Sequence, residues 1–509
     1  MATAPEPFPT KDVLRMLELG NSVAEFDESL EQYFVENEAF HALVTGKADV
    51  IAGDKGTGKT AVYRILQKRY SAIRQLDGVE VIPGFNPTGN PIFQKLVQQQ
   101  PLTEGQYAGV WKAYFLSLVG NWILEIVGST HSPSFLQLER MLLETGLRSK
   151  DDRPETVFSK ITNTIQRVFE PRSAEIEFTL SESGIPIITP RVTFDNPNKQ
   201  EQLQLQQEVP HERALRLLND CLGEVGYSVW VAMDRLDEAF DGFPAIEVPA
   251  LRALLRTYLD LLEFDRIKLK LFVRRDLFRK IIGDGFVNLT HINARKMEIV
   301  WDEADLLNLL SRRIRDNKQF IDALKVEGWP DEKLFYRLFP EKVDQAERKP
   351  TTWKWIMSRI RDGNDVKPPR NLIGLANLAR EEQIRSDSRT PRNLDQQVPL
   401  FSSDAIRGAH DRLSEQRVED TLLAEAGAEV APLINRFRNA KAEHNLDTLR
   451  NTLRLDGDAL QSAIRQLVQI GFLEALRASW KVPMLYRDGL GVTQGKAFAV
   501  GQDVDAESE

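Results

Sequence analysis

Near its N-terminal end the chain carries the run Gly53-Asp54-Lys55-Gly56-Thr57-Gly58-Lys59-Thr60, a complete G-x-x-x-x-G-K-T phosphate-binding loop. Residues 48–52 before it predict a short buried strand, and residues 61–66 after it predict the opening of an amphipathic helix. Glycines let the backbone of such a loop curl so that its N–H groups point inward, and the helix N-terminus adds its positive end. We therefore expect the loop, together with Ala61 after it, to bind the phosphates of a nucleoside triphosphate.

The end of this loop and a later strand predict a metal site. Lys59 is expected to reach the β- and γ-phosphates of the nucleotide, and the Thr60 hydroxyl is expected to ligate Mg²⁺. P-loop ATPases also need an acid at the end of a neighbouring strand to hold the water shell of Mg²⁺. The buried strand expected at 227–233 ends in Asp234, which fits that position. The sequence thus predicts ATP and Mg²⁺ as cofactors, with Thr60 and Asp234 at the metal.

Two acids that follow Asp234 compete for orienting the water that attacks the nucleotide: Asp237 and Glu238. Arg235 occupies the position where many such ATPases carry a glutamate for this task. We therefore expect slow hydrolysis that depends on Asp237 or Glu238. The alternative is that both acids only cap the helix that follows them.

Composition and charge limit the class of protein. The 509 residues suggest about three domains, and the net charge of −9 argues against coating nucleic acid over the whole surface. The one cysteine, Cys221, fits a reducing cytoplasm, and the six histidines lack metal-ligand spacing, so no zinc site is expected. The N-terminus lacks signal-peptide features, and the most apolar stretch, 114–128, carries Asn121 and Glu125 and is too short to span a bilayer. We expect a cytoplasmic protein that does not enter a membrane.

Strands and helices alternate around the loop, which predicts a parallel sheet with helices on both faces. The expected fold class is α/β: a P-loop nucleoside-triphosphatase sheet with a large helical insertion, a helical lid and a C-terminal winged-helix domain. The expected parts are an N-terminal lead with the first part of the core (1–90), a mostly helical insertion with a β-hairpin (91–212), the second part of the core (213–300), the helical lid (301–440), the winged helix (441–500) and an acidic tail (501–509).

The insertion is deduced from the spacing of the two motifs. Lys59 and Asp234 are 175 residues apart, far more than two strand–helix units need. A hairpin is expected inside the insertion, with strands at 175–180 and 186–189 around a four-residue turn. Aromatic residues at helical spacing between 111 and 123 predict helix packing rather than a ligand surface.

The C-terminal region has the order of elements of a winged helix. One helix is expected to start at Leu446 and a second to run from about 458 and stop at Gly471, with strands at 472–476 and 483–487. The candidate recognition helix has one basic residue, Arg465. Three further basic residues could contact backbone phosphates from the wing: Arg477, Lys481 and Arg487. The net charge of residues 441–500 is only about +2, so DNA binding and docking to a protein both stay open.

The loop and the D-x-x-D-E cluster at 234–238 resemble the AAA+ and STAND branches of P-loop ATPases. More narrowly, they are similar to bacterial orphan ATPases with a G-D-K-G-T-G-K-T loop and a C-terminal winged helix. The resemblance covers residues 20–75 and 225–380. STAND proteins place an arginine that senses the γ-phosphate after the strand that ends at 273, so the resemblance implies this role for Arg274 or Arg275. AAA+ proteins use a neutral polar residue there, and the chain departs from that branch.

The same resemblance implies roles for two further arginines. Arg295 precedes a short apolar strand at 297–301, the neighbourhood in which AAA+ proteins carry an arginine finger that acts on a neighbouring subunit. Arg370 opens a helix similar to the lid helix whose arginine touches the nucleotide phosphates.

Three functions remain open from the sequence. The first is an ATP-dependent switch or regulator that forms homo-oligomers or binds a partner protein and is reset by slow hydrolysis. For this reading the resemblance implies a role in bacterial defence against mobile elements. The second is an ATP-dependent DNA-binding protein of the initiator or loader type that uses the winged helix. The third is a phosphotransferase that acts on a small molecule.

Overall fold

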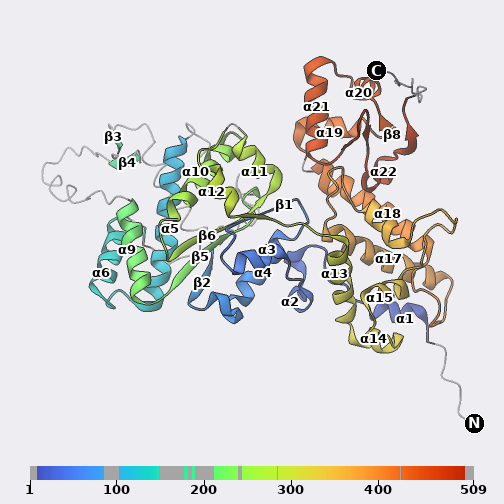
Figure 1. The fold of residues 1–509 in the computed structure, drawn as a ribbon, viewed down its shortest axis with the longest axis horizontal. Helices are drawn as coiled ribbons and strands as arrows, with labels where there is room; N and C mark the ends of the chain where they lie inside the picture. The colour runs from blue at the N-terminus through green and yellow to red at the C-terminus, as the bar shows by residue number, and fades with distance from the viewer. Residues whose placement is uncertain are drawn as a thin grey trace, which may run out of the picture. The chain divides into compact units, whose positions relative to one another are not determined.

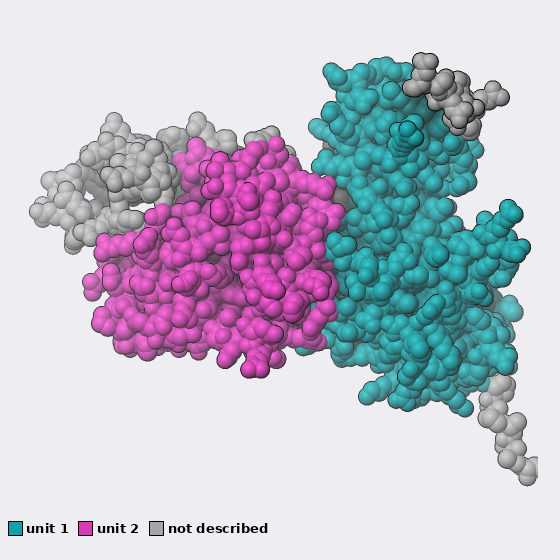
Figure 2. All heavy atoms as spheres, in the orientation of Figure 1, with its two compact units in different colours: residues 1–35, 54–58, 300–509 teal, residues 36–53, 59–299 magenta. Residues whose placement is uncertain are grey.

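The computed structural model describes residues 8–84, 102–145, 147–148, 177–180, 186–189, 211–238, 244–283, 285–424 and 426–498. The chain divides into two compact units (Figure 2). The helical unit comprises residues 1–35, 54–58 and 300–509, and the sheet unit comprises residues 36–53 and 59–299.

The sheet unit is built on five parallel strands, as the sequence predicts. They are β1 (Val50–Gly53), β2 (Val79–Pro83), β5 (Ser228–Met233), β6 (Ile267–Arg274) and β7 (Lys296–Glu298). Their order is β2-β5-β6-β1-β7, and every pairing in it is parallel. Parallel strands all end at the same edge of a sheet, so the residues that follow β1, β5 and β6 meet there.

Helices cover both faces of this sheet (Figure 1). One face carries α3 (Glu38–Val44) and α4 (Lys59–Arg69), and the other carries α10 (Pro244–Leu261), α11 (Arg275–Ile282) and α12 (Leu289–Ala294). Side chains alternate between the faces along a strand. Phe272 of β6 accordingly meets the ring of Tyr63 on α4 edge to face, with the ring centroids 5.5 Å apart, while Val50 and Ala52 of β1 belong to the core shared with α10.

The inserted helices belong to the core of the sheet unit. They are α5 (Glu104–Val127) and α6 (Pro133–Glu144), and α9 (His211–Glu224) begins where the insertion ends. The buried aromatic and aliphatic residues of these three helices pack with the sheet and α10. Trp111 of α5 donates its indole N–H to the Ala250 carbonyl of α10 at 2.9 Å. Helix packing is therefore the role of the aromatic stripe. The hairpin is confirmed as β3 (Glu177–Leu180) paired antiparallel with β4 (Pro186–Thr189).

Helix α5 differs from the sequence expectation in length. It has 24 residues and is long and apolar enough to cross a membrane, whereas the stretch 114–128 alone is too short. Of its most apolar window, 78% is buried inside the protein. This amount of burial is that of a central core helix.

The helical unit includes the residues that were expected to form the lid, and also the N-terminal segment. Its helices up to residue 435 are α1 (Thr10–Arg15), α2 (Leu30–Tyr33), α13 (Glu303–Arg315), α14 (Lys318–Leu324), α15 (Asp331–Leu338), α16 (Thr352–Arg359), α17 (Pro369–Arg389), α18 (Ser403–Gln416), a π-helix (Arg417–Leu423) and α19 (Gly427–Asn435). Arg380 of α17 donates its Nε–H to the Leu14 carbonyl of α1 at 2.7 Å. The first helix is thus part of this unit and not of the sheet unit, although we expected residues 1–90 to lead into the sheet.

The C-terminal region continues the same core. Its elements are β8 (Lys441–His444), α20 (Leu446–Leu453), α21 (Gly457–Gln469), β9 (Glu474–Ala475), β10 (Trp480–Lys481), α22 (Met484–Leu490) and β11 (Thr493–Lys496). Its strands form one four-stranded sheet in the order β11-β8-β10-β9, in which β10 pairs antiparallel with both β8 and β9. The order of elements from α19 to β10 is helix, strand, helix, helix, strand, strand, which is the order of a winged helix.

One strand expected in this region is wrong. Residues 484–487 form the start of α22, and the strand that pairs with β9 is β10. Pro483 stands immediately before the helix, where its fixed φ is compatible and its missing N–H has no consequence. A short apolar run such as 482–486 has no period long enough to separate a strand from a buried helix.

Candidate nucleotide-binding site

The phosphate-binding loop connects the end of β1 with the start of α4, as predicted. Gly56 and Gly58 have φ of +76° and +102°, a region that L side chains rarely adopt, so glycine is required at both. The Thr57 hydroxyl donates to the Asp54 carbonyl at 2.8 Å. Lys59 extends back across the loop and donates from Nζ to the Gly53 carbonyl at 3.0 Å. The loop thus has the conformation and the cation that phosphate binding needs.

Asp234 lies directly after β5 and is 2% exposed. Burial raises the pKa of its carboxyl to about 6, although hydrogen bonds from the Thr60 hydroxyl and the Arg235 N–H act in the opposite direction. Arg235 has a left-handed backbone with φ of 57°, a strained conformation that proteins retain mainly at functional sites. Among the described residues, no group donates a hydrogen bond to Asp234 Oδ2.

These contacts fit a divalent cation. Mg²⁺ prefers oxygen ligands and usually binds proteins through one or two carboxylates, keeping several waters. The Thr60 hydroxyl and the Asp234 carboxylate are hydrogen-bonded neighbours, and a buried carboxylate oxygen without a donor is costly unless a cation satisfies it. Thr60 and Asp234 are therefore the residues that would hold the metal.

Arg274 ends β6, the strand between β5 and β1, and its backbone is in register with Gly53. Its guanidinium makes two hydrogen bonds to Asp276, at 3.1 and 2.7 Å, and one to Asp237 at 3.3 Å. Burial lowers the pKa of Lys59, and the charges of Asp234, Asp237, Arg274 and Asp276 all act on its ammonium group. The structure therefore brings Lys59, Thr60, Asp234, Asp237 and Arg274 together.

The two residues with alternative assignments, Glu238 and Arg275, form ion pairs with other residues. Glu238 forms an ion pair with Arg235 at 3.4 Å, and its side chain is 45% exposed. Arg275 forms an ion pair with Glu298 of β7 at 3.0 Å. For the residue that orients the attacking water, the geometry favours Asp237 over Glu238. For the arginine that senses the γ-phosphate, it favours Arg274 over Arg275.

Arg295 lies at the other end of β1, away from the loop. Its side chain forms an ion pair with Asp49, the residue before β1, and donates to the Gly46 carbonyl at 2.8 Å. Asp49 also accepts from Lys270 at 2.6 Å and from the Tyr258 hydroxyl at 3.0 Å. The structure thus gives Arg295 a stabilising contact with a buried acid and does not bring it to the loop of its own chain.

Residues 54–58 of the loop contact other parts of the helical unit. The backbone N–H of Arg370, at the start of α17, faces the Gly56 carbonyl at 3.5 Å. A Cβ placed on Gly56 would lie 3.0 Å from Arg370 Cβ and 3.3 Å from Pro368 Cβ, so both side chains run along this glycine. Trp301 donates its indole N–H to the Thr57 carbonyl at 2.8 Å. Arg370 lies at the start of α17 beside the loop, and its role as a lid arginine stays a prediction. Trp301 belongs to no motif and was not predicted from the sequence.

A change of Asp234 to Asn is expected to stabilise the protein without nucleotide and to weaken Mg²⁺-dependent nucleotide binding. The pKa is higher in the folded protein, about 6, than the usual value of 3.8, so the folded state holds its proton more tightly. Above pH 6 the ionised carboxylate therefore lowers stability, and this effect disappears as the pH falls below 4. One pKa unit corresponds to about 1.4 kcal/mol, so the expected gain at pH 8 is on the order of 2–3 kcal/mol.

Urea unfolding of both proteins at pH 8 and at pH 4, without Mg²⁺, measures this difference. Equal stability at pH 8 would show that the Asp234 carboxylate is not an uncompensated buried charge.

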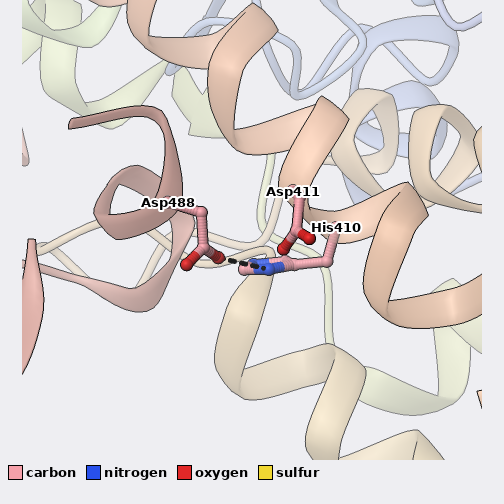
Figure 3. Close-up of side chains that lie close together, drawn as sticks. All are labelled: His410, Asp411 and Asp488. Atoms are coloured by element: carbon pink, nitrogen blue, oxygen red, sulfur yellow. Dashed lines mark ion pairs between the residues drawn. The ribbon is translucent and has the colours of Figure 1, made fainter. Parts of the chain in front are cut away.

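A second cluster of acids and a histidine lies in the helical unit (Figure 3). His410 and Asp411 of α18 and Asp488 of α22 offer ligand atoms within 4.8 Å of one another, the one such group in the described part of the chain. Asp488 is paired with His410 Nδ1 at 2.9 Å, and this hydrogen bond, with Arg359 and Arg487 nearby, lowers its pKa. The neighbouring arginines disfavour a cation, so the contact joins α18 to α22.

Comparisons with known proteins give structural neighbours only. No protein-family model and no curated protein matches the chain. The ORC2 protein of Aeropyrum pernix, in ADPNP–ADP complexes, is 13% identical, with 91% of this chain and 96% of that chain covered and a TM-score of 0.42. A Walker-type ATPase of Pyrococcus abyssi is 10% identical (90% and 96% covered, TM-score 0.39), and the ORC1 protein of Aeropyrum pernix in complex with DNA is 11% identical (92% and 96% covered, TM-score 0.37). At these identities and TM-scores, conclusions about the site rest on its own residues.

Proposed function

We propose that this chain is a P-loop ATPase that binds ATP with Mg²⁺, hydrolyses it slowly and acts as a nucleotide-dependent switch. One observation carries the proposal. The buried Asp234 carboxylate, with one oxygen free of any donor in the described residues, is hydrogen-bonded to the Thr60 hydroxyl at the end of a complete phosphate-binding loop. This combination is what a Mg²⁺-dependent nucleotide site requires.

Each residue of the group has a task in this proposal. Lys59 binds the β- and γ-phosphates, and Thr60 and Asp234 hold the metal, which when bound neutralises charge on the phosphates. Asp237 orients the attacking water, and Arg274 fixes Asp237 through their hydrogen bond at 3.3 Å. Hydrolysis breaks the bond between the γ-phosphorus and its bridging oxygen, and water supplies the new oxygen of the phosphate.

Hydrolysis is expected to depend on Asp237 rather than on Glu238. Asp237→Asn should lower the turnover of ATP by roughly 10²-fold or more, the usual contribution of a positioned general base, while nucleotide affinity stays unchanged. Glu238→Gln should leave turnover within about threefold, because Glu238 contacts Arg235 and is partly exposed.

Phosphate release under saturating Mg²⁺·ATP measures both variants, and calorimetry verifies that they bind ATP. If Glu238→Gln loses turnover and Asp237→Asn keeps it, the assignment of the two acids is reversed.

A second function, ATP-dependent DNA binding, is favoured by the order of elements from α19 to β10. On α21, Gln461, Arg465 and Gln469 are exposed at a spacing of four residues, and glutamine and arginine are side chains that read base edges. Arg487 cannot assist, because it is 5% exposed and bonded to the Val482 carbonyl and Gln494. DNA binding that falls steeply with salt concentration would favour this function over the switch.

The same proposal includes what the switch does when ATP is bound. We infer that ATP binding drives association with a second copy or a partner protein, and the resemblance to bacterial orphan ATPases suggests defence against mobile elements as the setting. The small excess of basic residues in 441–500 and the largely uncharged exposed face of α21 are compatible with protein docking.

A further inference from the structure

Two arginines of the helical unit stand out because they have no acceptor. Arg417, the first residue of the π-helix, is 8% exposed, and in the described part of the chain it forms no hydrogen bond or ion pair. Arg370 likewise makes no side-chain hydrogen bond or ion pair there, and its Nε is buried. Since arginine stays charged in proteins and carries five N–H donors, a buried arginine without an acceptor is costly.

The two guanidinium groups are neighbours. Gly374 lies one helical turn after Arg370 on α17, and a Cβ placed on Gly374 would be 3.5 Å from Arg417 Nη2. The head of Arg417 therefore lies against α17 within one turn of Arg370. Burial and, next in size, the charge of Arg370 lower the pKa of Arg417 to about 10.

Asp420 acts on Arg417 and Asp362 acts on its neighbour Tyr486, but in the described part of the chain neither acid forms an ion pair with Arg417 or Arg370. Asp420, three residues after Arg417, is exposed and forms no ion pair with it. Asp362 accepts backbone N–H groups of Asn364 and Val366, both at 2.9 Å, and burial raises its pKa to about 6. Tyr486 is buried beside Arg417, and burial raises the pKa of its hydroxyl, so it stays neutral. The pair is therefore a concentration of positive charge that an anion would satisfy.

The position of Arg370 and Arg417 indicates which anion would bind them. The side chain of Arg370 runs along Gly56 of the phosphate-binding loop, with its Cδ 3.3 Å from the place a Cβ of Gly56 would take. Arg370 thus lies next to the loop expected to hold nucleotide phosphates, and the head of Arg417 lies one helical turn further along α17. π-Helical segments are rare and are frequently found at functional sites, and this one begins at Arg417.

We propose that Arg417 binds the terminal phosphate of the nucleotide together with Arg370, and that this pair distinguishes a nucleoside triphosphate from a diphosphate. The inference rests on the proposed function, which assigns the nucleotide to the loop. The lid helix contributes one arginine to the phosphates, Arg370. Arg417 adds a second cation from the segment that leads into the winged-helix region, so it connects the γ-phosphate with that region.

The test compares the full-length wild-type protein with Arg417→Met. Thermal unfolding and calorimetry are measured with Mg²⁺ plus ATP, ADP or inorganic phosphate. For Arg417→Met the affinity for ATP should fall roughly 10- to 100-fold, as expected for the loss of hydrogen bonds to a charged group, while the affinity for ADP stays within about twofold. Without ligand the variant should unfold at the same temperature or higher, because an uncompensated buried charge is replaced by an apolar side chain of similar size.

Arg412→Met is the matched control, because Arg412 lies on α18 and is paired with Glu381 and Glu382. It should bind ATP and ADP as the wild type does. The inference is overturned if Arg417→Met binds ATP as tightly as the wild type, if it loses ATP and ADP affinity equally, or if inorganic phosphate stabilises the wild type as much as ATP does. A wild-type protein that binds neither nucleotide would instead contradict the proposed function itself.

Discussion

Lys59→Ala is expected to abolish tight ATP binding and with it all hydrolysis. Lys59 donates across the loop to the Gly53 carbonyl, and its ammonium group is the loop's cation in the group with Asp234 and Asp237. A hydrogen-bonded charge at a phosphate contributes about 1.5–3 kcal/mol, and the loss of the loop's cation adds electrostatic repulsion, so the affinity should fall by at least about 100-fold.

Calorimetric titration with Mg²⁺·ATP measures this loss, and Lys68→Ala is the control. Lys68 is an exposed lysine of the same helix, α4, and its removal should leave ATP affinity unchanged. Equal ATP affinity in Lys59→Ala and the wild type would show that the loop does not bind ATP.

Asp49→Asn is expected to destabilise the sheet unit strongly. Burial opposes the ionisation of Asp49, but Arg295 and Lys270 outweigh it and hold its pKa below the usual value. Lys270 is 1% exposed, and its ammonium group also lies 3.8 Å from the centroid of the Trp230 ring. Removing the acid leaves Lys270 as an uncompensated buried charge, which costs about 3–5 kcal/mol in comparable pairs.

Urea unfolding monitored by circular dichroism measures the destabilisation. The double variant Asp49→Asn/Lys270→Met should recover a large part of it, because neither charge then remains buried without the other. A loss below about 1 kcal/mol in the single variant would show that the network does not hold the sheet together at the start of β1.

The sequence predicts the half of the site that depends on local geometry. A strand, a loop with glycines at fixed positions and a helix form a contiguous unit, so Gly53 to Thr60 could be placed from spacing alone. Asp234 could be placed because parallel strands end at one edge of a sheet, and the acid follows a buried apolar run. The presence of parallel strands and of the pair β3 and β4 follows from the same periodicities, whereas the order of the strands in the sheet does not.

The remaining residues depend on contacts between distant parts of the chain. No local pattern distinguishes Asp237 from Glu238 or Arg274 from Arg275; only the placement of Arg235 and Glu298 does so. Trp301 and Arg417 were missed for the same reason. The hydrogen bond to Thr57 spans 244 residues, and the position of Arg417 against Gly374 depends on the packing of α18 on α17. The strand wrongly predicted at 483–487 shows that a run of five residues is too short to distinguish a strand from a helix.

Native mass spectrometry of the full-length protein shows directly whether this chain holds ATP and Mg²⁺ through its phosphate-binding loop. With Mg²⁺ and ATP, each wild-type chain should gain the mass of one nucleotide with metal, and each Lys59→Ala chain should gain none. The same spectra report whether ATP changes the number of chains in the particle. A wild-type chain that carries no nucleotide at saturating ATP would contradict ATP binding by this loop. A Lys59→Ala chain that carries as much nucleotide as the wild type would contradict it equally.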